Sequence, residues 1–165
     1  MTNPLPVAFV AGFEGAWRID GITAPTGDAL APAARLAVVE GPEAEQADGR
    51  WVLRGTVDAS HEPEAGGPPL GRPEARCAAL VAVRLGDGWR ALSRDERDRR
   101  VLAATDHPAV ARRLHHAGGD QPFDLLAWFE YPPVDEDAVA SLVAGLRATE
   151  DWSAVEREVD LRLVR

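Results

Sequence analysis

Short apolar segments recur along the whole chain, and their pattern restricts the fold more than any other feature of the sequence. Alternating apolar residues predict strands over residues 5–13, 16–24, 35–41 and 50–59. The continuous apolar run 76–85 predicts a buried strand, and two more strands are expected over 123–131 and 153–165. Residues 60–75 are rich in proline and glycine, which predicts an irregular and mostly exposed connection.

Helical patterns occur in the second half of the chain. Residues 89–107 are expected to contain a helix, because Ser93 and Glu96 have the spacing of an N-terminal capping box. Residues 132–152 carry apolar residues at helical spacing and give the strongest helical pattern.

Residues 107–117 are also predicted to form a short amphipathic helix. Pro108 would occupy its first turn, Val110 and Leu114 lie four residues apart, and two glycines at 118 and 119 would end it. The surrounding stretch 105–119 contains three of the four histidines of the chain.

This order of elements predicts an α+β fold with an antiparallel sheet and helices on one face. The second half suits a ferredoxin-like unit. A chain of 165 residues is expected to form a single domain over 1–165, or two small halves that share one core.

The composition argues against some classes of function. The net charge is −9, whereas a general nucleic-acid-binding protein needs a basic face. The apolar runs are short and the N-terminal segment lacks the features of a signal peptide, so we expect no membrane association and a cytoplasmic protein. Cys77 is the only cysteine and is expected to be a buried core thiol.

Several segments resemble the chlorite dismutase family, in particular its short-subunit branch of dimeric haem b proteins. The similar segments are 16–41, 51–57, 71–83, 112–131 and 146–165, which together extend over most of the chain. The resemblance implies a dimeric α+β barrel built from two ferredoxin-like halves. A degenerate N-terminal half would comprise residues 1–85, and the C-terminal half residues 86–165.

The resemblance also implies the positions of the haem-site residues. In haem-containing members, a helical histidine is the proximal iron ligand and lies thirteen residues before a distal arginine. Arg112 matches that arginine, but Arg99 lies thirteen residues before it, where no histidine is found. The connection between residues 97 and 108 is also shorter than the family pattern. We therefore infer that the ligand-bearing segment is deleted.

Other expected haem contacts are also changed. Leu85 stands where the family has a lysine, and only Trp89 remains of a tryptophan pair. Glu150 or Asp151 would be the remnant of the carboxylate that orients the proximal imidazole. His107 is the histidine that a haem would require as an unorthodox ligand. Trp128 and Trp152 are expected to be core aromatics. Trp89 is expected to be one as well, if it is not a haem contact.

Two interpretations of Arg112 remain open at this point, and a metal site at the histidines was also considered. Arg112 would either hold an anion or pair with a carboxylate such as Glu130. A zinc site built from His61, His107, His115 and His116 is disfavoured, because no closed set of ligands is recognisable. The acidic segment 156–160 is interpreted as a solvated strand face.

Three alternative hypotheses about function follow from these observations. The favoured hypothesis is a non-catalytic member with a degraded haem site, which binds no cofactor and instead takes a small anionic or apolar ligand near Arg112 or serves as a partner subunit. It would form a homodimer, or a heterodimer with a related chain. The first alternative is an active haem b oxidoreductase that converts chlorite to chloride and dioxygen or acts as a peroxidase. The second is a purely structural interaction protein.

Overall fold

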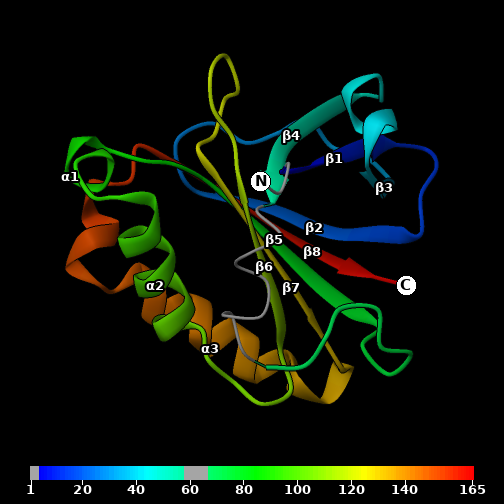
Figure 1. Ribbon diagram of the computed structural model, residues 1–165. Coiled ribbons are helices and arrows are strands. Elements are labelled where there is room, and N and C mark those ends of the chain that lie inside the picture. Colours follow the sequence, from blue (N-terminus) through cyan, green and yellow to red (C-terminus); the bar gives the residue numbers. More distant parts are fainter. Residues whose placement is uncertain (1–3, 58–66) are drawn as a thin grey trace.

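The computed structural model describes residues 4–57 and 67–165, which form a closed antiparallel β-barrel with helices on one side (Figure 1). The mixed α+β class is therefore as predicted. The strands are β1 (Leu5–Gly12), β2 (Trp17–Thr26), β3 (Arg35–Glu40), β4 (Trp51–Val57), β5 (Cys77–Arg84), β6 (Ala111–His116), β7 (Leu125–Tyr131) and β8 (Arg157–Val164). The helices are α1 (Asp87–Arg90), α2 (Arg94–Ala104) and α3 (Glu136–Arg147), and short 3₁₀ turns are η1 (Pro42–Glu45), η3 (Pro133–Asp135) and η4 (Glu150–Ala154).

The strand order around the barrel repeats between the two halves of the chain. The order is β1-β3-β2-β8-β5-β7-β6-β4, with β4 paired to β1. Each half therefore has its strands in the order fourth, first, third, second. Strand β5 lies between β7 and β8 and pairs with both.

The described α-helices all belong to the second half, where they cover one side of the sheet (Figure 1). Helix α2 begins as predicted, because the Ser93 hydroxyl accepts a hydrogen bond from the Glu96 backbone N–H at 3.2 Å. Acidic residues Glu136 and Asp137 occupy the first turn of α3, where they complement the helix dipole.

The predicted helix over 107–117 is wrong, because residues 111–116 form strand β6. They pair along their whole length with β7, from Ala111 opposite Glu130 to His116 opposite Leu125. Residues four apart share a face in a helix and in a strand, so the spacing of Val110 and Leu114 did not distinguish the two. Pairing with an established strand provides backbone hydrogen bonds that a short isolated helix lacks.

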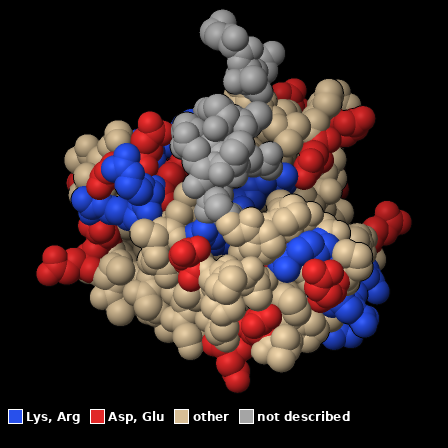
Figure 2. Space-filling model, turned by 60° about the horizontal axis from the view of Figure 1, so that its bottom comes forward, with Lys and Arg blue, Asp and Glu red and all other residues tan. Residues whose placement is uncertain are grey.

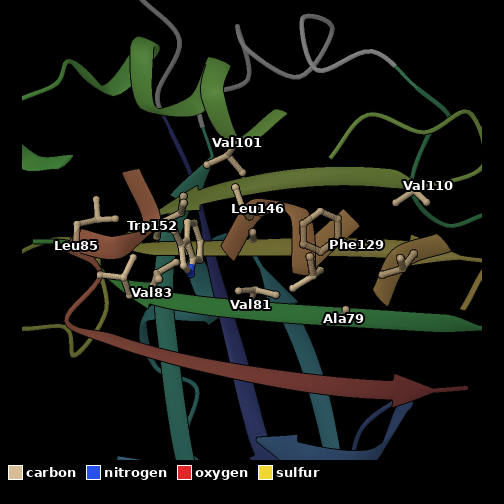
Figure 3. Packing of buried hydrophobic residues seen from close by; sticks show 14 of the residues in the cluster. Ala79, Val81, Val83, Leu85, Val101, Val110, Phe129, Leu146 and Trp152 are labelled. Carbon is tan, nitrogen blue, oxygen red and sulfur yellow. The ribbon is translucent and has the colours of Figure 1, made fainter. Parts of the chain in front are cut away.

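The buried apolar residues form two clusters on opposite faces of the sheet. Alternate residues of β5 explain the division: Ala78, Leu80 and Ala82 face the barrel interior, with Phe9 and Trp128, whereas Ala79, Val81 and Val83 face the helices. In Figure 3, these outward residues and Phe129 of β7 lie against Val101, Leu146 and Trp152 from the helical side. Cys77 belongs to the same helix–sheet cluster and is buried, as predicted, and burial raises the pKa of its thiol.

Candidate functional site

The Arg112 side chain lies between β6 and the end of α2, on the helical side of the sheet. Its guanidinium donates hydrogen bonds to the Leu102 carbonyl and, at 3.3 Å, to the Thr105 hydroxyl. Asp106 lies 3.5 Å away, but its side chain is 77% exposed, so this ion pair is largely screened by water. Because the last carbonyls of a helix lack partners within it, Arg112 stabilises the C-terminal end of α2.

A buried guanidinium at position 112 would destabilise the fold if it had no hydrogen-bond partners. The Arg112 side chain is only 3% exposed, and burial lowers its pKa, with Asp106 opposing the shift. The predicted pairing of Arg112 with Glu130 does not occur. Glu130 instead accepts hydrogen bonds from the Trp128 indole at 2.7 Å and from the Gly71 backbone N–H at 2.8 Å. Residues 112 and 130 lie on opposite faces of the sheet, so this alternative for Arg112 does not apply to Glu130.

The neighbouring Arg113 points into the barrel. It donates hydrogen bonds to Glu40 at 2.7 Å and to Nε2 of His115 at 3.0 Å, and Nδ1 of His115 lies 3.0 Å from the Leu126 carbonyl. Burial, followed by the charge of Arg113, lowers the pKa of His115 to about 3. His115 is therefore neutral, with both ring nitrogens occupied by protein partners.

The other described histidines also have structural contacts. Nδ1 of His107 accepts a hydrogen bond from the Ala109 backbone N–H at 3.1 Å, which closes the turn before β6. Nε2 of His116 lies 2.9 Å from an Asp98 carboxylate oxygen, and this contact joins β6 to α2. His61 lies outside the described residues. Within residues 4–57 and 67–165, no group of three or more His, Cys, Asp or Glu side chains could hold a metal ion.

The carboxylate expected to orient a proximal imidazole is paired with an arginine. Asp151 of η4 pairs with Arg100 of α2 at 2.7 Å, whereas Glu150 is exposed. Arg99, which lies thirteen residues before Arg112, is 73% exposed and pairs with Glu96. The partner that α2 provides for the Asp151 carboxylate is therefore the guanidinium of Arg100 and not an imidazole.

The three tryptophans considered as cofactor contacts are buried in the two clusters. Trp89 donates a hydrogen bond to the Asp151 carbonyl and packs edge-on against Trp152, with ring centroids 6.2 Å apart. Trp128 lies in the barrel interior against Phe9 and Trp17. Leu85 is 3% exposed and belongs to the helix–sheet cluster. All of these side chains pack as core residues.

Segment 156–160 is not a solvated strand face, because two of its acids are buried. Glu158 is 1% and Asp160 is 4% exposed. Arg147 of α3 donates hydrogen bonds to both carboxylates at 2.7 Å, and Arg162 and Trp152 complete the set. These hydrogen bonds raise the pKa of Arg147 although burial opposes the shift. Charge alternation along β8 gave no sign that α3 would cover it.

Two hollows lie near the C-terminal end of β6. One of about 300 Å³ is lined by α1, the first turns of α2 and the ends of β6 and β7, and it includes Arg90, Arg94, Arg97 and His116. The second, of about 230 Å³, is also lined by His116, together with Arg54 and Gln121. The first hollow was not predicted from the sequence, although the i, i+3 spacing of Arg94 and Arg97 places both side chains on one face of α2.

The fold and sequence resemble a solved structure closely enough to decide the family. The dimeric chlorite dismutase from Nitrobacter winogradskyi is 36% identical, with a TM-score of 0.79, and the match covers 96% of this chain and 99% of that chain. The chain belongs to the chlorite dismutase family.

More distant chlorite dismutases share the fold. Two mutant forms of the enzyme from Candidatus Nitrospira defluvii are 12% and 13% identical, with TM-scores of 0.58 and 0.60. Their matches cover 99% of this chain and 92% and 93% of those chains. No model of a protein family matches the sequence, and no curated protein matches it either. The chlorite dismutase resemblance found in the sequence is thus confirmed.

The described residues contain no helix that is both long and apolar enough to cross a membrane.

Proposed function

We propose that this chlorite dismutase family member does not use haem and instead binds a small ligand as a homodimer made of ferredoxin-like halves. The proposal rests on two sets of contacts that involve α2. Arg112 is engaged by the end of the helix, and Arg100 takes the carboxylate that the resemblance assigns to a proximal imidazole.

The residues between the helices and the sheet do not fit a haem. A histidine-ligated haem requires an imidazole facing the iron from the side opposite a distal group. His115 points into the barrel with both nitrogens occupied, and His116 lies on the same side of β6 as Arg112 and contacts Asp98. His107 faces its own turn.

The space between helices and sheet also supports the proposal. Val101 of α2 and Val110 are fully buried, and Phe129 of β7 is 1% exposed. They pack with Val143 and Leu146 of α3 in one continuous cluster. A flat macrocycle would have to displace these side chains, and opening such a core costs several kcal/mol.

Titration with hemin tests the proposal. We expect no sharp, stoichiometric Soret band, and no dioxygen release when the hemin-treated protein is mixed with chlorite. The Nitrobacter winogradskyi chlorite dismutase is the positive control. A saturable Soret band with one haem per chain, which disappears in His107→Ala or His116→Ala, would refute the proposal and favour the haem enzyme.

The proposed homodimer rests on the dimeric relative and is tested by light scattering coupled to size exclusion. A mass near twice 17.7 kDa is expected, whereas a monomer at micromolar concentration would contradict this part of the proposal.

A further inference from the structure

The hollow beside the start of α2 has an unusual lining for an acidic protein. The chain carries a net charge of −9, yet Arg90, Arg94 and Arg97 all line this space of about 300 Å³. On the face shown in Figure 2, basic side chains occur in small groups bordered by acidic ones. The lining also contains Asp98 and Asp124, so its three arginines outnumber its acidic residues by one.

The two acids that line the same hollow each have a protein partner, although Oδ1 of Asp98 is buried without a hydrogen bond to any described residue. Asp124 accepts a hydrogen bond from the Leu85 backbone N–H at 2.8 Å and lies 3.4 Å from Arg90. Asp98 contacts His116 at 2.9 Å. In contrast, the side chains of Arg94 and Arg97 have no hydrogen bond or ion pair with any described residue. Two guanidinium groups thus remain available to a ligand.

The inner wall of the hollow is apolar and well packed. Leu85, Trp89 and Leu125 are each less than 5% exposed. The Trp89 ring is held by its hydrogen bond to the Asp151 carbonyl and by Trp152. A volume of about 300 Å³ is at the lower end of small-molecule sites, so a ligand of a few carbon atoms with one or two anionic groups suits it.

We infer that this hollow is a binding site for a small organic anion, a phosphate monoester or a carboxylate, which Arg94 and Arg97 hold against the wall of Leu85 and Trp89. A guanidinium presents a planar fork of donors that matches the paired oxygens of either group. Arg94 lies in the first turn of α2, an 11-residue helix whose N-terminal dipole also favours an anion.

This inference rests on the proposed function, because it locates the ligand of a haem-independent protein. It also moves that ligand from the vicinity of Arg112 to the opposite end of α2.

Two double variants with equal change of charge test the site. Arg94→Gln with Arg97→Gln removes both available guanidinium groups from the hollow. Arg18→Gln with Arg99→Gln is the matched control, since both residues are more than 60% exposed and lie outside the lining. Melting temperatures of both variants are compared with that of the wild type, so that a loss of folding is recognised.

Calorimetric titrations use inorganic phosphate, glycerol 3-phosphate and succinate at constant ionic strength. We expect saturable binding of at least one probe to the wild type and to the control variant. In the variant that lacks the Arg94 and Arg97 guanidinium groups, binding should be weakened about tenfold or more, because charge-assisted hydrogen bonds to the anion are lost. The probe that binds most tightly shows whether the site prefers free phosphate, a phosphate monoester or a carboxylate. Equal weakening in the two double variants, or no binding of any probe at millimolar concentration, would overturn the inference.

The hemin titration separates the two proposals. If the wild type binds hemin stoichiometrically while the anion still binds through Arg94 and Arg97, the proposed function fails and the anion site stands. If hemin is not bound and the anion probes do not bind either, only the anion site fails.

Discussion

The structural role of Arg112 is open to a direct stability measurement. In Arg112→Met, the apolar part of the side chain is kept and the guanidinium is lost. The Thr105 hydroxyl retains its hydrogen bond to the Val101 carbonyl at 2.8 Å, and the Leu102 carbonyl retains a bond from the Thr105 backbone N–H at 3.3 Å. The two guanidinium hydrogen bonds to Leu102 and Thr105 are lost, but both partners keep another hydrogen bond and a buried charge is removed, so the net loss is on the order of 1.5–3 kcal/mol.

We expect Arg112→Met to lower the free energy of unfolding by about 2 kcal/mol, which corresponds to a fall in Tm of about 4–8 °C for a chain of this size. Urea denaturation followed by circular dichroism measures the change. Asp106→Asn is the control, with a change below about 0.5 kcal/mol, because Asp106 is exposed. If Arg112→Met altered stability no more than this control, Arg112 would not be an anchor of α2.

Further perturbations examine other parts of the structure. Arg147→Met leaves the buried Glu158 without its cation and should cost about 3 kcal/mol in urea denaturation, whereas adding Glu158→Gln should recover part of it; no recovery would contradict a charge effect. His115 has a folded-state pKa near 3, below its unfolded value of about 6.5, so it favours folding above pH 6.5 and this contribution is lost as pH falls toward 3. In His115→Gln, the slope of unfolding free energy against pH between 6 and 4 should decrease by about 1.4 kcal/mol per unit; an unchanged slope would contradict the burial of a neutral imidazole. Gly86→Ala would place Cβ 1.9 Å from the Ala154 carbonyl oxygen, so a clear fall in Tm is expected by calorimetry, and an unchanged Tm would refute this close approach.

The sequence was most informative where a pattern has only one structural solution. The run of β5 has apolar residues at every position but the last, and it is indeed covered on both faces by the two clusters. Ser93 and Glu96 mark the start of α2, because the hydrogen bond between them depends only on local spacing. Family resemblance then provided the barrel, which propensity alone would not have given.

Long-range contacts account for what the sequence did not predict. Strand β6 was mistaken for a helix because its register is set by β7, which begins nine residues after β6 ends. Arg147 covers Glu158 and Asp160 from another element, so a charged alternation that usually faces water became a buried network. The partners of Arg112 and Asp151 likewise depend on how α2 lies on the sheet, and no local pattern encodes that placement.

The presence of two separate apolar clusters has a consequence for how such proteins diverge. The barrel interior is filled by its own strands, so that side of the sheet does not depend on which residues the helices contribute. A substitution or a change of length in the α2 region would affect the outer layer, where Val101 packs. The outer layer of such a chain can thus change over evolutionary time while the barrel beneath it is retained.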